Sequence, residues 1–455
     1  MIDFKKEVLK RKEEIITHTK NLLRINSELT VFQSDSDMPF GQGIHDSLMY
    51  MLNLADKDGF QTLNADGYAG HIEYGDQFEY VGMMGHLDVV PAGSGWDYPP
   101  YAAEVVDNKI IARGAMDDKG PTMAAYYAMK IIKELNLPLS KRIKLILGTD
   151  EETAWRGVKY YFKLFPEQPI YGFIPDAGFP LTYAEKGILR VSIENTCSCD
   201  QLVMFQAGMV DNMVPDHCVA IISDLNQKDA FLNYLNTNNL TGEALITEFG
   251  LRLSVEGKSA HGSTPQEGVN AAFLMVKFLN EIKLSNAFID LINMYLLDDP
   301  FGRKMGVDYH DEETGHVTIN AGLFEFKDNQ FMITLNPRYP NNVDSDIFIN
   351  KLEGVFKAQG HKVDIRSHQK RLYIDPNSTL VKTLLSVYNK HTNQDAKPLT
   401  TGGGTYARAM ENSVAFGPHF PGTESLIHQR NEYIDIDDLL NATAIYAESL
   451  YELAK

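Results

Sequence analysis

Histidines and acids of metal-ligand type stand at five places in the chain, most of them directly after a predicted strand. In Gly85-His86-Leu87-Asp88, His86 and Asp88 face the same side, because alternate residues of an extended chain do so. A neutral imidazole binds a metal ion through one nitrogen, while a nearby carboxylate accepts a hydrogen bond from the other. The remaining four places contain Asp117-Asp118, Asp150-Glu151-Glu152, Asp176 and His428.

The run Asp150-Glu151-Glu152 is the most informative of these places. Three adjacent acids after a buried strand repel one another and are costly to desolvate unless cations or partners compensate them. Asp117-Asp118 stands between glycines at a predicted helix start, where capping needs only one Asp. Each place alone is typical of ordinary structure. Together, two histidines and several carboxylates suit Zn²⁺ or Mn²⁺, and the set is large enough for two ions.

The elements that must position these residues have α/β character. Buried strands are predicted within residues 80–90 and 141–148, with a helix over 121–135 between them. This order favours a right-handed crossover and a largely parallel sheet, which binds ligands at the carboxyl ends of its strands. Amphipathic helices are predicted at 4–25 and 436–453.

The middle of the chain has a different pattern. From about residue 187 to residue 372, strand-like runs alternate with helical runs, which indicates an α+β segment of two similar halves. We therefore predict a discontinuous metal-binding α/β domain with a mostly parallel sheet, formed by residues 1–186 and 373–455. An α+β lid domain, residues 187–372, interrupts it.

The composition excludes several partners. The chain has 42 Lys and Arg against 61 Asp and Glu, a formal net charge of −19, which repels nucleic acid and anionic membranes. No apolar run is long enough for a membrane span, and the N-terminus is too charged for a signal peptide. The cysteines, Cys197, Cys199 and Cys218, are typical of a reducing compartment and lack a second pair for a metal site. We therefore expect a cytoplasmic protein.

Nine segments of the chain, taken together, resemble the di-zinc exopeptidase family of carnosinase, carboxypeptidase G and aminoacylase, and within it the bacterial dipeptidase V branch. The resemblance extends over nearly the whole chain. The segments that carry it are GHLDVVPAGSGW (85–96), ARGAMDDKGP (112–121), GTDEE (148–152), PDAGFP (175–180), NMVPDH (212–217), GKSAHGSTPQEGVNA (257–271), NPRYP (336–340), GGGTYAR (402–408) and HQRNEY (428–433).

The resemblance implies a site for two divalent metal ions, Zn²⁺ in the first place and Mn²⁺ as the alternative. The ligands that it implies are His86 and Asp176 for one ion, Glu152 and His428 for the other, and Asp117 bridging both. By the same resemblance, Asp88 supports His86. Glu151 matches the general base, which takes a proton from a water between the metals and returns it to the leaving amine.

Three residues of the middle segment match substrate-binding positions of the family, and the glycine run at 402–404 suggests backbone that a substrate can approach. The resemblance implies that His261 holds the oxyanion and that Asn212 and Arg338 grip the substrate's C-terminal carboxylate. Gly404 would offer open backbone near the substrate. The resemblance also implies that the second half of the middle segment takes the place of a partner's domain, so that His261 acts within its own chain. We therefore expect a monomer.

The sequence thus predicts a metallopeptidase that cleaves small peptides, namely dipeptides with a free N-terminus. Asp at position 176 is found in dipeptidase and tripeptidase members, whereas deacylating members more often have Glu. An N-acyl-amino-acid hydrolase remains an alternative, as does a non-catalytic peptide-binding protein, although the latter would be expected to lack Glu151 or a ligand. An NAD-dependent oxidoreductase would need a G-x-G-x-x-G loop after a strand, which the chain does not supply.

Overall fold

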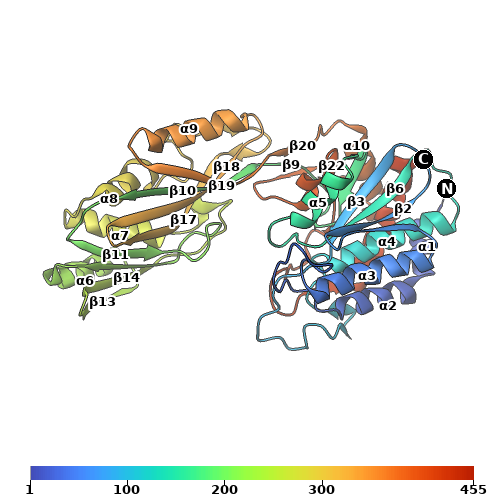
Figure 1. Ribbon diagram of the computed structural model, residues 1–455, viewed down its shortest axis with the longest axis horizontal. Helices are drawn as coiled ribbons and strands as arrows, with labels where there is room; N and C mark the ends of the chain where they lie inside the picture. Colours follow the sequence, from blue (N-terminus) through green and yellow to red (C-terminus); the bar gives the residue numbers. More distant parts are fainter. Residues whose placement is uncertain (1) are drawn as a thin grey trace. The chain divides into compact units, whose positions relative to one another are not determined.

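The computed structural model describes residues 2–455, which form two compact units (Figure 1). Unit 1 contains the described residues up to Tyr183 together with Ile374–Leu399 and Thr405–Lys455. Unit 2 contains Ala184–Tyr373 and Thr400–Gly404. The predicted fold class is confirmed, because an α+β unit interrupts an α/β unit that has parallel strands at its centre.

A mixed sheet forms the centre of unit 1. Its inner strands run parallel, in the order β6 (Arg142–Gly148), β3 (Tyr80–His86), β7 (Tyr171–Ile174) and β22 (Ser413–Ala415). Antiparallel strands extend it on both sides: β2 (Ala69–Tyr74) and β1 (Gln61–Ala65) beyond β6, and β9 (Thr182–Glu185) beyond β22. Every residue of β3 is buried, which is typical of a strand covered on both faces.

Helices α4 (Lys119–Glu134) and α11 (Ile436–Ala454) pack against each other and against β3 and β6. They correspond to the helices predicted at 121–135 and 436–453. The other long helices of unit 1 are α2 (Lys12–Leu23), which packs on α4, α3 (Gln42–Lys57), which lies against β1 and β2, α5 (Arg156–Leu164) against β2, and α10 (Thr379–Thr392) against α11.

The prediction of one N-terminal helix over residues 4–25 was wrong, because this segment forms α1 (Phe4–Leu9) and α2. Arg11 leaves the helical region, with φ −110° and ψ 10°. Its Nη1 donates to the carbonyl of Glu7 at 2.7 Å, and its Nη2 lies 2.6 Å from the carboxylate of Glu134 on α4. Apolar spacing does not reveal such a break, since it depends on a partner from a distant helix.

Unit 2 is built on one continuous antiparallel sheet. Its strands follow the order β13 (Gly242–Thr247), β14 (Gly250–Glu256), β12 (His217–Ile222), β11 (Leu202–Ala207), β17 (Thr318–Lys327), β18 (Gln330–Tyr339), β10 (Gly187–Thr196) and β19 (Lys362–Gln369). Helix α7 (Ala271–Glu281) packs on β11, β12 and β14, and α9 (Ser345–Lys357) packs on β19. The similarity of two halves stays a prediction.

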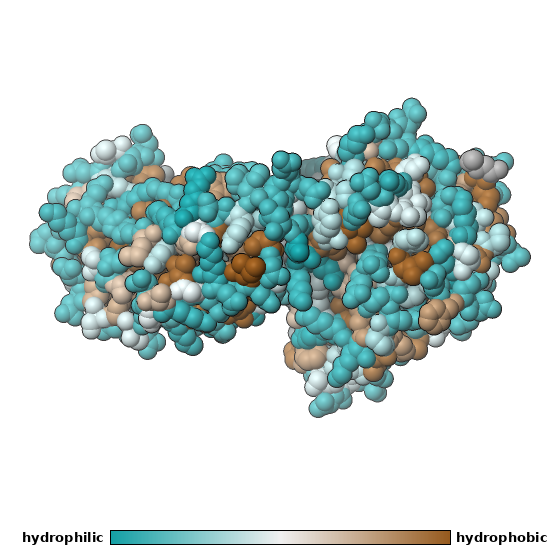
Figure 2. Space-filling model, turned by 90° about the horizontal axis from the view of Figure 1, so that it is seen from above, coloured by the Kyte–Doolittle hydropathy of each residue, from teal (hydrophilic) through white to brown (hydrophobic). Residues whose placement is uncertain are grey.

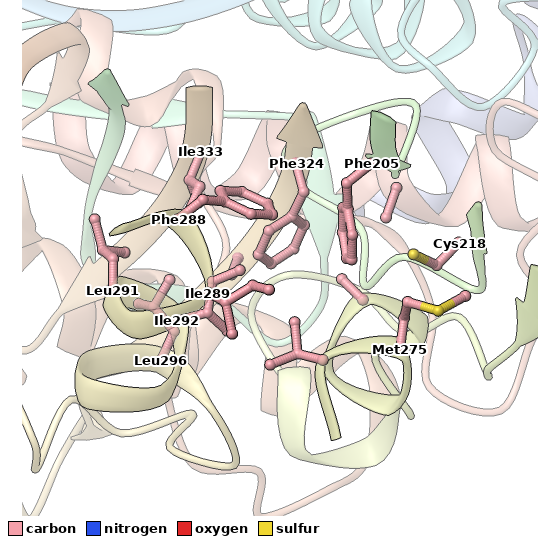
Figure 3. Close-up of a cluster of buried hydrophobic side chains, with 14 of the residues drawn as sticks. Phe205, Cys218, Met275, Phe288, Ile289, Leu291, Ile292, Leu296, Phe324 and Ile333 are labelled. Atoms are coloured by element: carbon pink, nitrogen blue, oxygen red, sulfur yellow. The ribbon is translucent and has the colours of Figure 1, made fainter. Parts of the chain in front are cut away.

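Aliphatic and aromatic side chains together form the core of unit 2 (Figure 3). The ring of Phe205 lies 5.1 Å from that of Phe288 and 6.4 Å from that of Phe324, measured between centroids. Aromatic pairs at such distances contribute beyond their buried area, by about 0.5–1.5 kcal/mol each. The core therefore holds the sheet of unit 2 as a firm platform for the residues at its surface.

The surface carries mostly hydrophilic side chains on the face drawn in Figure 2, and its apolar residues form small groups. This is the surface expected from the excess of 61 acidic over 42 basic residues. Within residues 2–455, none of the helices combines the length and the apolar character that crossing a bilayer requires.

Gly85, the residue of β3 before His86, leaves room for a carboxylate and a hydroxyl. A Cβ at this position would lie 2.1 Å from Oγ1 of Thr122 and 2.7 Å from Oδ2 of Asp118. We expect Gly85→Ala to lower the free energy of unfolding by about 1–3 kcal/mol, the usual cost of overpacking. Urea denaturation of the metal-free protein, followed by circular dichroism, measures it.

Gly178→Ala is the matched control, because a Cβ at Gly178 would meet only the carbonyl oxygen of His419, at 3.9 Å. This variant should unfold at nearly the same urea concentration as the unchanged protein. Equal stability of the two variants would contradict the close packing around Gly85.

Candidate metal centre

Three parallel strands end at one edge of the sheet of unit 1 and deliver polar residues there. The register pairs His86, the last residue of β3, with Gly148, the last residue of β6. The loop after β6 contains Glu151 and Glu152, and Asp176 follows β7 by two residues. The carboxyl ends of parallel strands are where open α/β sheets place their ligands.

The predicted metal-binding side chains come together at this edge, with Asp117 in the middle. Nε2 of His86 lies 2.9 Å from Oδ1 of Asp117, and Nε2 of His428 lies 2.9 Å from Oδ2 of the same carboxylate. Each oxygen of Asp117 thus faces one histidine. Three sets of side chains have potential ligand atoms within 4.8 Å of one another: His86, Asp117 and Asp176; Asp117, Glu152 and His428; and His86, Glu151 and Glu152.

Burial and close contact shift the protonation of these groups. Burial, reinforced by the charge of Asp117, raises the pKa of Asp176 well above its usual range. Burial alone would lower the pKa of His86, but hydrogen bonds with Asp117 and Asp88 raise it well above its usual value. Hydrogen bonds with Asp117 and Glu152 raise the pKa of His428 to about 10.

The donor set of this centre fits divalent cations. It consists of imidazole nitrogens and carboxylate oxygens, the ligands that Zn²⁺ and Mn²⁺ take in proteins. In the metal-free protein the positive charge between the carboxylates is supplied by protons on His86 and His428, whose pKa values are raised. Since two protonated imidazoles occupy the positions between the acids, two cations can take over the same electrostatic role.

Glu151 is partly buried, and Asp88 holds its loop. Burial raises the pKa of Glu151 to about 8, while the charge of His86 acts in the opposite direction. The two oxygens of Asp88 accept the backbone N–H groups of Glu151 and Glu152, both at 3.1 Å. Nδ1 of His86 lies 3.0 Å from the backbone oxygen of Asp88 and 3.5 Å from its Oδ1. Asp88 therefore touches both His86 and the loop that carries the glutamates.

Asp118 lies outside the three ligand sets. Its Oδ2 accepts the backbone N–H of His86 and the hydroxyl of Thr122, both at 3.0 Å. It is the residue before α4, yet its side chain makes no capping hydrogen bond within the described chain. The carboxylate thus fixes the end of β3.

Two buried neighbours of the centre were not predicted. The ring of Tyr406 lies 6.1 Å from that of His86, and a Cβ at Gly148 would lie only 2.3 Å from its hydroxyl. Glu432 accepts the backbone N–H of Asp117 at 3.1 Å. The sequence signal that could have revealed Glu432 is an acid four residues after the candidate ligand His428, in a segment that packs against a distant loop.

Unit 2 gathers the four predicted substrate-binding residues near one another. Arg338 is buried, and its Nη1 donates to the carbonyl of Gly402 at 2.7 Å, in the glycine run that includes Gly404. Gly262 donates its N–H to the carbonyl of Asn212 at 2.6 Å. A Cβ at Gly262 would lie 3.1 Å from Oδ1 of Asn336, the oxygen that also accepts from Arg338 at 3.3 Å.

His261 belongs to the same region of unit 2. Its Nδ1 lies 2.6 Å from the hydroxyl of Ser263. Burial, with the positive charge of Arg338 in the same direction, lowers the pKa of His261. The imidazole is therefore neutral near neutral pH and can offer one N–H to a ligand.

Residues 82–452 match the model of Peptidase family M20/M25/M40. "Putative dipeptidase YtjP" of Bacillus subtilis (strain 168) is 42% identical over 463 residues, which cover 99% of this chain and 99% of the relative. "Putative dipeptidase" of Staphylococcus epidermidis is 40% identical over 465 residues, again with 99% of both chains covered.

Solved structures share the fold at low sequence identity. Human carnosine dipeptidase 1 matches with a TM-score of 0.56 and 17% identity, over 99% of this chain and 98% of that one. The M20 family metallo-carboxypeptidase Sso-CP2 from Sulfolobus solfataricus matches with a TM-score of 0.60 and 18% identity, over 96% and 98%. The di-peptidase Dug1p from Saccharomyces cerevisiae matches with a TM-score of 0.57 and 13% identity, over 99% and 98%.

Uptake of divalent cations by the metal-free protein should release protons. The raised pKa values of His86 and His428 mean that both imidazoles are protonated at neutral pH, whereas a metal ligand must be neutral. At about pH 7.5 we expect release of about two protons per chain from the imidazoles and a further contribution from Asp176, whose pKa is also raised, together with an apparent affinity that rises with pH. Calorimetric titration with Zn²⁺ in buffers of different ionisation enthalpy measures the number.

The variant His428→Ala serves as the comparison and should release about one proton fewer. If the heat of binding is the same in all buffers, no protons are released, and the two histidines are not protonated in the metal-free protein.

Proposed function

The chain belongs to peptidase family M20/M25/M40, and from this membership we propose that it is a metal-dependent dipeptidase. The family resemblance inferred from the sequence is confirmed, and the protein is a peptide-bond hydrolase. The proposal concerns the length of the substrate, the two ions and the roles of individual residues. The relatives from Bacillus subtilis and Staphylococcus epidermidis carry dipeptidase in their names, which supports the substrate length.

The observation that carries the proposal is the position of Asp117 between two histidines. Its oxygens lie 2.9 Å from Nε2 of His86 and 2.9 Å from Nε2 of His428, as suits a carboxylate that bridges two cations. We assign His86 and Asp176 to one ion and Glu152 and His428 to the other. Zn²⁺ and Mn²⁺ are the ions that suit these donors.

When bound, such a pair of cations would activate a water molecule and polarise the scissile carbonyl. Glu151 takes up a proton on its carboxylate and returns it to the leaving amine. Burial raises the pKa of Glu151 to about 8 in the metal-free protein, and nearby cations would lower it again, so that the carboxylate can both accept a proton and give it up. Asp88 keeps Glu151 in place through the backbone hydrogen bond between them, at 3.1 Å.

Substrate recognition falls to unit 2. Arg338 presents a guanidinium fork that matches a carboxylate in geometry and charge, and Asn212 assists it. His261 donates a hydrogen bond to the oxygen on which negative charge develops. Gly404, which is exposed, offers its backbone to the substrate.

The alternatives of the same fold differ in their substrates. An N-acyl-amino-acid hydrolase would take a blocked N-terminus, and Asp at 176 favours the free one, by resemblance to the dipeptidase members of the family. A non-catalytic peptide-binding protein is disfavoured because Glu151 and all five candidate ligands are present. The cytoplasmic location and the monomeric state stay predictions, supported by cysteine usage and by the two-half interpretation of unit 2.

The variant Glu151→Gln should lose turnover while keeping its metal. A general base contributes about 10²–10⁴-fold to the rate, and the amide cannot accept the proton. The measurement is kcat for a dipeptide together with the metal content of the same sample. Asp117→Asn is the contrasting variant, because loss of the carboxylate charge between two cations should reduce metal content as well as activity. Near-normal turnover in Glu151→Gln would refute its assignment as the base.

Both end groups of a peptide should determine whether it is hydrolysed. If Arg338 and Asn212 bind the C-terminal carboxylate and the metal centre receives the free amine, dipeptides are hydrolysed, while tetrapeptides, C-terminal amides and N-acetylated dipeptides are poor substrates. Arg338→Lys should raise KM for dipeptides, since a point charge does not replace a bidentate fork. A panel that varies only length and end groups on one dipeptide tests this. Efficient cleavage of tetrapeptides would refute the proposed length, and preference for the acetylated form would favour the N-acyl hydrolase.

A further inference from the structure

Glu432 is a buried carboxylate whose four hydrogen-bond donors all come from one short loop. It is 1% exposed. Its Oε1 accepts the backbone N–H groups of Met116 at 2.9 Å and of Asp117 at 3.1 Å. Its Oε2 accepts Nη1 of Arg113 at 2.6 Å and the N–H of Gly114 at 3.2 Å. One side chain thus accepts three of the five backbone N–H groups of residues 113–117.

The backbone around Glu432 continues a strand pairing up to this loop. β24 (Tyr433–Asp435) pairs antiparallel with β5 (Lys109–Ile111), and the carbonyl of Glu432 accepts the N–H of Ala112 at 3.0 Å. After Ala112 the loop leaves the strand, and its N–H groups need other acceptors because buried donors without partners are costly. The carboxylate of Glu432 accepts three of these N–H groups, those of Gly114, Met116 and Asp117.

The same segment of the chain carries a candidate ligand. His428 stands four residues before Glu432, and its Nε2 lies 2.9 Å from Oδ2 of Asp117. The backbone of Asp117 is thereby fixed by Glu432, while its side chain meets His428. Asn431 anchors the segment further, with its Oδ1 accepting the N–H of Asp97 at 2.9 Å and its Nδ2 donating to Oδ2 of Asp97 at 2.8 Å.

We propose that Glu432 is a positioning residue that sets the separation of Asp117 and His428, and with it the affinity for the ion assigned to Glu152 and His428. This inference rests on the proposed function, because it concerns the ions assigned there. Glu432 touches neither the ligand atoms of Asp117 nor those of His428. Glu432 acts on Asp117 through the backbone N–H of that residue, and on His428 through the short segment of chain that joins them.

The charge of Glu432 is balanced within its own surroundings. Arg113 is 2% exposed and forms its ion pair with Glu432 at 2.6 Å, so the two residues together add no net charge beside the acids of the centre. The pair therefore supplies hydrogen-bond geometry rather than attraction for cations. Glutamine at this position would turn an N–H₂ group toward backbone donors, and aspartate would fall short by one methylene.

Stepwise titration of the metal-free protein with Co²⁺, followed by its visible absorption, tests the proposal. The unchanged protein should bind two ions, and His428→Ala identifies the absorption change that belongs to the ion held by His428. Glu432→Gln should lower the affinity for that ion by about 10–100-fold, the usual effect of removing a group that orients a ligand. The visible absorption of the bound ion should change as well. The ion assigned to His86 and Asp176 should be affected less.

Glu28→Gln is the matched control. Oε1 of Glu28 accepts the N–H of Ala92 at 2.9 Å and the hydroxyl of Tyr101 at 2.7 Å, so this acid also holds loop residues of unit 1, and neither of these residues is a candidate ligand or belongs to the 113–117 loop. Both affinities should stay unchanged in this variant. Glu432→Asp keeps the charge and both acceptor oxygens but shortens the side chain by one methylene. It should lower the affinity for the same ion if the position of the carboxylate is what matters.

The outcomes separate the inference from the proposed function. If the unchanged protein binds fewer than two ions, the two-ion proposal fails. If it binds two and Glu432→Gln matches it, only the role of Glu432 is overturned. Wild-type affinity in Glu432→Asp would likewise overturn the role, because charge alone would then suffice. Should Glu432→Gln not fold, as judged by circular dichroism, Glu432→Asp decides the question alone.

Discussion

Mutual repulsion of acids that are buried or partly buried at one sheet edge is the constraint on which the arrangement of unit 1 depends. Asp117, Glu151, Glu152 and Asp176 lie around two histidines, and the negative charges of these acids repel one another. Their loops are held by carboxylates that belong to none of the candidate ligand sets. Asp118 accepts the N–H of His86. Asp88 and Glu432 do the same for the loops after β6 and before α4.

This division of tasks explains why the centre contains more acids than two ions need. The acids that point at the centre carry the charge that cations compensate. The acids behind them accept backbone N–H groups, which are fixed donors that cannot move away. A carboxylate that receives two or three such bonds is held in one orientation, and it holds the donating loop in turn.

The sequence revealed the parts of this arrangement that depend on local pattern. Buried runs located β3 and β6, and the strand ends located the candidate ligands, because side-chain alternation and parallel pairing are regular. The roles of individual residues came from the family resemblance. The break at Arg11 and the partners of Glu432 were not predictable, since they depend on contacts between segments far apart, such as Glu432 and Asp117, which are separated by 315 positions.

The distance along the chain between the parts of the centre has a consequence for biosynthesis. His86, Asp117, Glu151, Glu152 and Asp176 are made early, whereas His428 and Glu432 emerge only after the whole of unit 2. At a ribosomal rate of about 5–20 residues per second, the roughly 250 residues between Asp176 and His428 take on the order of 10–50 s to synthesise. During that interval the nascent chain carries the acids without the segment that ties down the 113–117 loop. The metal centre is therefore completed late in synthesis, and until then the loop that carries Asp117 lacks the acceptor oxygens of Glu432.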